Sequence, residues 1–273
     1  MMKFNLNKRL VLITGASSGI GRSCAIEFSK KGAYVALIGR NNDYLKEVEK
    51  NIIDDDGCAA SFNFDLNNLH EISELVVGIE NKFNKTIDIL VNCAGIAVSG
   101  LIEDVPLSVV NEVITVNTIA PMELTRCVLP MMKRKKIGQI INVSSGAGSR
   151  GIPGNSSYCA SKFALNGWTE SLRVEVRGYG IDVINYSPGP TNTNIVERTK
   201  SFGSLKNKFT SISKSSSEEI ARSLVNASMN RKLRVDYSLK NALSCHLNMW
   251  FPSLIDLLMH NIHKKSFNNI YES

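Results

Sequence analysis

The chain has 273 residues, of which 43% are apolar and 21% are charged. This length is enough to bury a large hydrophobic core, and the composition excludes a mostly disordered chain, a collagen-like chain and a small disulfide-stabilised scaffold. The 32 basic and 25 acidic residues give a net charge of +7, which fits an anionic ligand, an anionic membrane surface or nucleic acid without choosing among them.

Short runs rich in β-branched residues alternate with helical patterns, which is typical of βαβ units around a parallel sheet. The runs are almost continuously apolar, which favours strands covered by helices on both faces. The predicted strands span residues 10–14, 34–38, 60–63, 87–92, 139–144 and 182–186. The predicted helices span residues 19–31, 42–53, 69–83, 107–132 with a break, and 158–177. The sequence therefore predicts an α/β fold with a doubly wound parallel sheet.

A glycine-rich turn directly follows the first predicted strand and leads into a helix, with the sequence Thr14-Gly15-Ala16-Ser17-Ser18-Gly19-Ile20-Gly21. Glycines let the backbone turn tightly and approach a pyrophosphate, and the N-terminus of the next helix offers N–H groups and a positive dipole end. This context favours a dinucleotide site over a plain turn. The predicted cofactor contacts here are Gly15, Ser17, Ser18, Gly19, Ile20 and Gly21.

The second predicted strand ends at Ile38-Gly39-Arg40, where an NAD-binding protein usually carries an acid for the ribose hydroxyls. Asp43 is expected to lie in the next helix instead. The forked donors of Arg40 suit a 2′-phosphate, so we predict NADP(H) as the cofactor. The alternative is that Arg40 merely faces solvent.

Tyr158 and Lys162 form a YxxxK pattern within a predicted helix. Side chains four residues apart lie on one helix face, so the ammonium of Lys162 is expected to favour the phenolate and lower the pKa of Tyr158. The pattern alone is common in helices. Its combination with the glycine turn is far more specific.

Together these motifs resemble those of the short-chain dehydrogenase/reductase family, in its single-domain branch, over about residues 8–193. The matching motifs, in chain order, are the glycine turn, Asp65, Asn92-Cys93-Ala94-Gly95, Asn117, Ser144-Ser145, Tyr158 with Lys162, and Pro188-Gly189. Residues 91–100 are also similar to the matching stretch of 3-ketodihydrosphingosine reductases. Two features depart from the family: Cys93 replaces an asparagine, and the C-terminus lacks the frequent glycine-rich tail.

The resemblance implies a Rossmann-type sheet and a hydride transfer between NADP(H) and a carbonyl carbon, with Tyr158 as general acid/base. Lys162 would lower the pKa of Tyr158 and bind the nicotinamide ribose. Ser145, thirteen residues before Tyr158, would hold the substrate oxygen, and Asn117 would position a water. The further cofactor contacts implied are Asp65, Leu66, Asn92, Ala94, Gly95, Pro188, Gly189, Thr191 and Thr193.

The composition changes after Pro190. Residues 191–217 are polar and are expected to form a lid, and Ser216 with Glu219 predicts a capped helix start.

We expect residues 1–238 to form the catalytic domain and residues 239–273 an apolar extension, interrupted too often to span a membrane. The extension has three interpretations: a helix packed on the core or on a second subunit, an interfacial membrane helix over residues 239–265, or a wall of the substrate site.

The sequence thus predicts an oxidoreductase that interconverts a ketone and a secondary alcohol, with a hydrophobic or lipid-like substrate. The alternatives are a short-chain keto-ester or acyl-thioester reductase and a non-catalytic NADP(H)-binding sensor. Retention of Asn117, Ser145, Tyr158 and Lys162 favours the enzyme. We expect a homodimer or homotetramer, no nucleic-acid partner and no metal site, and a cytoplasmic location because the N-terminus shows no secretory signal.

Overall fold

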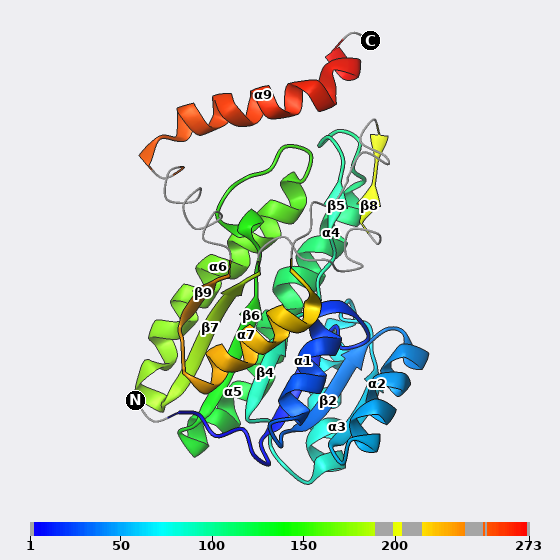
Figure 1. Cartoon of the computed structure of the whole chain (residues 1–273), viewed down its shortest axis with the longest axis vertical. Coiled ribbons are helices and arrows are strands. Elements are labelled where there is room, and N and C mark those ends of the chain that lie inside the picture. The colour runs from blue at the N-terminus through cyan, green and yellow to red at the C-terminus, as the bar shows by residue number, and fades with distance from the viewer. Residues whose placement is uncertain (1–2, 189–198, 204–214, 238–247, 249, 272–273) are drawn as a thin grey trace.

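A computed structural model of the chain describes residues 3–188, 199–203, 215–237, 248 and 250–271, and the side chains up to residue 261 (Figure 1). Three predicted cofactor contacts, Gly189, Thr191 and Thr193, lie outside the described residues. So do most of the expected lid and residues 239–247 of the apolar extension.

A seven-stranded parallel sheet runs through the centre of the protein in the order β3-β2-β1-β4-β6-β7-β9. Its strands are β1 (Leu10–Thr14), β2 (Tyr34–Gly39), β3 (Cys58–Asn63), β4 (Ile89–Asn92), β6 (Gly138–Val143), β7 (Ile181–Ser187) and β9 (Arg234–Asp236). The order reverses between β1 and β4, and ligands of doubly wound folds bind at this point, beyond the carboxyl ends of the strands. The predicted fold class is confirmed.

Helices cover both faces of the sheet, as Figure 1 shows. One face carries α1 (Gly19–Ser29), α2 (Asn42–Asp54) and α7 (Ser217–Met229), and the other carries α3 (Ile72–Phe83), α5 (Ala120–Lys135) and α6 (Ser156–Val176). Because successive strand side chains point to opposite faces, Val11 and Ile13 join one core while Leu10 and Leu12 join the other.

The long helix predicted over residues 107–132 is continuous but contains a π-helical turn between two α-helical parts. It begins as α4 (Leu107–Ile114), widens into the π-helical turn η2 (Thr115–Ile119) and continues as α5. Such π turns occur often at functional sites. The predicted break corresponds to this turn, which carries Asn117.

Three short strands escaped prediction: β9 at the sheet edge, and the two-residue pair β5 (Val98–Ser99) and β8 (Lys200–Ser201). The predicted capped helix start is confirmed, because Ser216 and Glu219 form a reciprocal capping box at the start of α7.

The C-terminal helix α9 (Pro252–Tyr271) lies beyond the carboxyl end of the sheet, at the top of Figure 1. Large apolar side chains at its start are exposed, namely Trp250, Phe251, Leu254, Leu257 and Leu258. These side chains therefore do not pack on the core of this chain. Within the described part of the chain, no helix combines the length and apolar character that crossing a membrane requires.

Candidate active site

The glycine turn and the loop after β4 pack tightly against each other. The hydroxyl of Thr14 accepts hydrogen bonds from the N–H groups of Cys93 and Ala94, both at 3.0 Å. Gly15 has a φ of +70°, and a Cβ there would lie 2.9 Å from the Cα of Ala94. A Cβ on Gly21 would lie 2.3 Å from the Gly15 carbonyl oxygen. The cradle therefore requires glycine at both positions.

The helix that follows this turn suits an anion. Helix α1 starts at Gly19 and carries no acidic residue in its first turn, so nothing there opposes the positive end of its dipole. The cradle and the helix end together fit the pyrophosphate of a dinucleotide.

Arg40 lies at the end of β2, with 61% of its side chain exposed. Its guanidinium is 3.9 Å from a carboxylate oxygen of Asp65 and 3.9 Å from one of Glu112. Asp43 lies in the first turn of α2, as expected. Arg40 is therefore a cation at the position where dinucleotide-binding folds meet the adenosine ribose.

Tyr158 and Lys162 occupy successive turns of α6, and Ser145 caps the short helix η3 (Gly146–Gly148) after β6. The Lys162 ammonium donates a hydrogen bond to the Val143 carbonyl oxygen at 2.9 Å and lies 6.0 Å from the centre of the Tyr158 ring. A Cβ on Gly95 would lie 3.7 Å from Lys162 Nζ and 3.4 Å from Asn117 Oδ1. The structure thus brings the four predicted catalytic side chains to one edge of the sheet.

The titration of Tyr158 differs from the expectation. Burial raises the pKa of Tyr158, and its hydrogen bond with Ser145 opposes this rise. Burial also lowers the pKa of Lys162 to about 8. The net shift of the Tyr158 pKa is thus upward, because desolvation of the phenol outweighs its hydrogen bond with Ser145, and a lowering by Lys162 stays a prediction for the site with its oxidised cofactor.

Cys93 replaces the usual asparagine beside this cluster and packs against the hydrophobic core. Burial raises the pKa of its thiol to about 12, while the nearby Lys162 acts in the opposite direction. The thiol is thus neutral at ordinary pH, and Cys93 serves here as a small packing residue.

Asn117 is fully buried and uses its side chain as a brace. Its Oδ1 accepts from the Ile96 N–H at 2.8 Å, and its Nδ2 donates to the Ile96 carbonyl at 2.9 Å and to the Ser161 hydroxyl at 3.0 Å. Both amide protons are used. The side chain therefore has no free amide proton, and the positioning of a water by Asn117 stays a prediction.

A chain of buried amides crosses the sheet below the site. Asn92 Nδ2 donates to Asn142 Oδ1 at 2.8 Å, and Asn142 Nδ2 donates to the Thr169 hydroxyl at 2.9 Å. Asn92 thereby ties β4 to β6 and indirectly to α6.

Two other predicted cofactor contacts are placed by the structure. Leu66 is buried, with 6% exposed, so its side chain contributes to the core. Pro188 directly follows β7 at the same edge as Ser145.

Sequence reasoning missed Asn166, whose side chain hydrogen-bonds Ser144, Gly148 and Asn185. Ser144 and Gly148 are the ends of the loop that carries Ser145, residues 144–148, which we call the serine loop. A single asparagine within a helix carries no motif that would have singled it out.

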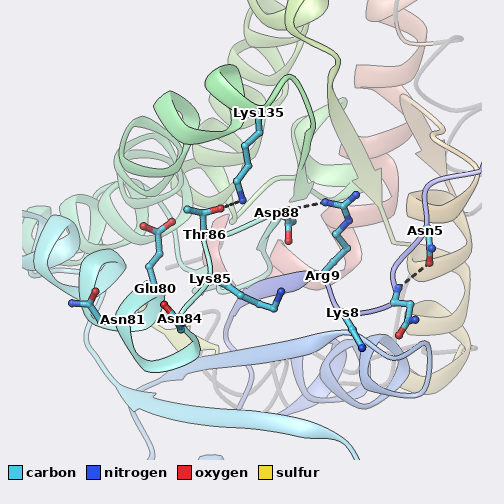
Figure 2. A pocket seen from close by; sticks show the side chains of 11 residues that line it. Asn5, Lys8, Arg9, Glu80, Asn81, Asn84, Lys85, Thr86, Asp88 and Lys135 are labelled. Carbon is cyan, nitrogen blue, oxygen red and sulfur yellow. Dashed lines mark hydrogen bonds and ion pairs between the residues drawn. The ribbon is translucent and has the colours of Figure 1, made fainter.

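A cavity of about 670 Å³ opens at the opposite edge of the sheet, before the amino ends of the strands (Figure 2). Two of its basic groups have partners within the cavity: Arg9 lies 3.1 Å from Asp88, and Lys135 donates to the Thr86 hydroxyl. Lys85 lies 5.4 Å from the centre of the Tyr34 ring. This cavity is therefore separate from the candidate active site.

A doubly wound sheet with a glycine cradle after its first strand, and a Ser–Tyr–Lys cluster beside it, defines an α/β oxidoreductase. The family model described as short chain dehydrogenase matches residues 9–202. The chain belongs to the short-chain dehydrogenase family, whose members oxidise or reduce alcohol and carbonyl groups.

The similar proteins include a 3-ketodihydrosphingosine reductase of Bos taurus, 32% identical over 245 residues, which cover 86% of this chain and 74% of the relative. The likeness noticed at residues 91–100 thus extends over most of the chain. A solved metagenomic short-chain oxidoreductase in complex with NADP is 28% identical, with a TM-score of 0.72 over 85% of this chain and 97% of its own. A short-chain dehydrogenase from Burkholderia phymatum in complex with NAD has a TM-score of 0.83 over 92% of this chain and 96% of its own. At 20% identity it supports the fold alone.

Proposed function

We propose that the protein is an NADP(H)-dependent reductase that interconverts a ketone and a secondary alcohol in a hydrophobic, lipid-like substrate. The observation that carries this proposal is the cluster of Ser145, Tyr158 and Lys162 beside the glycine cradle at the switch point of the sheet. The cluster offers a hydroxyl donor, a hydrogen-bonding partner for the substrate oxygen and a buried cation within one site.

The roles follow from the chemistry of these groups. When bound, the nicotinamide cofactor supplies or accepts the hydride. The Tyr158 hydroxyl, whose raised pKa keeps it protonated at neutral pH, donates a proton to the substrate oxygen during reduction. Ser145 hydrogen-bonds that oxygen, and the Lys162 ammonium stabilises the phenolate that forms. Asn117 fixes Ile96 and Ser161 around them.

The cofactor would rest on the glycine cradle, with its adenosine toward Arg40 and Asp65. Arg40 supports NADP(H), because an exposed guanidinium pairs well with a 2′-phosphate and no carboxylate ends β2. The remaining cofactor contacts in this proposal are Ser17, Ser18, Ile20, Leu66, Asn92, Ala94, Gly95, Pro188, Gly189, Thr191 and Thr193.

Two observations support a lipid-like substrate. The bovine relative carries the name of a reductase for a ketone with a long hydrocarbon chain. The start of α9 exposes five large apolar side chains beyond the carboxyl edge of the sheet, where the candidate site lies. We include in the proposal a peripheral membrane contact through residues 239–265, a catalytic unit of residues 1–238 and a homodimer or homotetramer.

The substrate class is tested by following NADPH oxidation with ketones of graded chain length, from a short keto ester to a 3-keto sphingoid base. The proposal predicts that kcat/KM rises with chain length, because each buried methylene adds about 0.8 kcal/mol of favourable transfer free energy. Turnover restricted to the short keto ester would favour the short-chain reductase instead.

A further inference from the structure

Asn166 joins three segments around the candidate active site. It lies on α6, one helical turn beyond Lys162 and two beyond Tyr158. Its Oδ1 accepts hydrogen bonds from the Ser144 hydroxyl at 2.5 Å and from Asn185 Nδ2 at 3.0 Å. Its Nδ2 donates to the carbonyl oxygen of Gly148 at 2.8 Å. One side chain thus holds the segment after β6, the end of β7 and helix α6 together.

The two loop residues that Asn166 contacts stand on either side of Ser145. Ser144 is buried with 4% exposed, and Gly148 is pressed against α6. A Cβ on Gly148 would lie 2.7 Å from Asn166 Nδ2, 2.8 Å from the Lys162 carbonyl oxygen and 2.9 Å from the Ser144 hydroxyl. The loop therefore contacts the helix closely enough to transmit a small displacement of Asn166.

The position of the Ser145 hydroxyl depends on this loop. It accepts a hydrogen bond from the Ala147 N–H at 3.2 Å, within the same short helix, and it hydrogen-bonds Tyr158 on α6. Asn166 connects the element that carries the serine to the element that carries the tyrosine.

We propose that Asn166 is a positioning residue that fixes the Ser145 hydroxyl relative to the Tyr158 hydroxyl. It does so by clamping residues 144–148 onto α6, and the inference rests on the proposed function in that these two hydroxyls act on the substrate oxygen. An error of about 1 Å in such a pair can cost about 100-fold in rate.

The clamp needs an acceptor and a donor on one planar group. Leucine at this position offers neither, although its volume is similar. Aspartate keeps the acceptor but places a negative oxygen against the Gly148 carbonyl oxygen, which repels it. The two substitutions therefore separate loss of the clamp from reversal of one of its bonds.

The test compares Asn166→Leu and Asn166→Asp with wild type in the full chain, by kcat, by cofactor Kd and by phenolate absorbance during a pH titration. Tyr158→Phe identifies which absorbance belongs to Tyr158. We expect kcat to fall about 10- to 100-fold with cofactor Kd within about twofold. We also expect the pKa of Tyr158 to rise, because its bond with Ser145 lowers that pKa in the wild type. Lys162 and Cys159, which flank the phenol, are unchanged in both variants.

Thr169→Val is the matched control. Thr169 lies one turn further along α6, is fully buried and hydrogen-bonds Leu165 at 2.6 Å and Asn142 at 2.9 Å, without contact to the serine loop in those bonds. We expect it to lower the melting temperature while leaving kcat and the tyrosine titration near wild type. If Asn166→Leu behaves as Thr169→Val does, Asn166 is merely structural and the proposal is wrong.

If Asn166→Leu fails to fold, Ser144→Ala replaces it as the test variant. It removes one of the three bonds, and we expect the same tyrosine shift at smaller size; an unchanged titration would overturn the proposal. The titration needs no substrate, so it distinguishes failure of the clamp from failure of the proposed function. The latter would appear as a wild-type protein that reduces no ketone.

Discussion

Lys162 is a buried cation whose desolvation opposes folding. Lys162 is 4% exposed, and its ammonium donates a 2.9 Å hydrogen bond to the Val143 carbonyl oxygen; burial lowers its pKa to about 8 from 10.5. Burying a charged lysine opposes folding, and one hydrogen bond offsets this cost in part. Stability alone therefore does not account for a lysine at this position, which agrees with its proposed role in the site.

Lys162→Met should be inactive and yet more stable at pH 7, by about 1–3 kcal/mol from the size of the pKa shift. The folded pKa lies below the unfolded one, so the wild type loses a proton on folding between pH 8 and 10.5 and gains stability as pH rises through that window. The difference in free energy of unfolding between the variant and the wild type, measured with urea, should therefore be smaller at pH 10 than at pH 7. An advantage that does not change with pH would contradict the assigned cause.

Arg40→Asp tests the cofactor preference. The substitution places a carboxylate where the 2′-phosphate is expected, beside Asp65 and Glu112, and removes a charge-assisted pair. We expect the Kd of NADPH to rise about 10- to 100-fold more than that of NADH. Lys50→Asp, which makes the same charge change at an exposed position of α2, is the control. Equal weakening of both cofactors by Arg40→Asp would mean that Arg40 does not read the phosphate.

Motifs allowed the residues of the site to be predicted, but not their interactions. Tyr158 and Lys162 are proposed from the YxxxK pattern, and Ser145 from the resemblance to the family. The direction of the tyrosine pKa depends on burial, and the bonds of Asn117 depend on the π turn that faces Ile96. Such tertiary contacts leave no signal in a single sequence.

Among the elements, α9 contacts the segment between Ser145 and Tyr158 through the side chain of Arg150. This arginine lies between Ser145 and Tyr158 in the chain, and its guanidinium donates to Asn248 and to Asp256, both at 2.5 Å. The Arg150 side chain is 20% exposed but that of Asp256 is 67% exposed, so solvent and salt screen this ion pair as they screen a surface pair. The C-terminal helix is thereby linked to the loop that carries the serine.

Arg150→Met should release this link while keeping most of the apolar stem of the side chain. We expect faster proteolytic cleavage within residues 239–273 and a lower kcat/KM for long-chain ketones, with short ketones affected less. Arg126→Met, which breaks an ion pair with Glu123 on α5, is the control and should change neither. Unchanged cleavage in Arg150→Met would show that the contact does not hold α9.

The sequence predicted elements well where the pattern is long and apolar. All six expected strands appear within a few residues, and five of them are almost wholly buried; β3, at the sheet edge, buries only Ala60. The three missed strands have two or three residues, and β9 has none that is fully buried, so they form by pairing with a neighbour rather than by their own pattern.

At the scale of the whole molecule, the sheet order determines where chemistry takes place. Residues 77 to 80 positions apart, such as Thr14 with Val91, Cys93 and Ala94, meet because β1 and β4 are neighbours at the switch point. Motifs from β1, β4, β6 and α6 then converge on one edge. Because these motifs converge there, we propose that a tyrosine at this edge moves a proton during carbonyl reduction.

This role of Tyr158 is tested by comparing wild type with Tyr158→Phe, by NADPH oxidation with a long-chain ketone and by NADPH binding. The substitution removes one hydroxyl and leaves the ring in place. We expect a loss of turnover of at least about 100-fold, with the Kd of NADPH within about threefold of wild type. Turnover close to that of the wild type would contradict it.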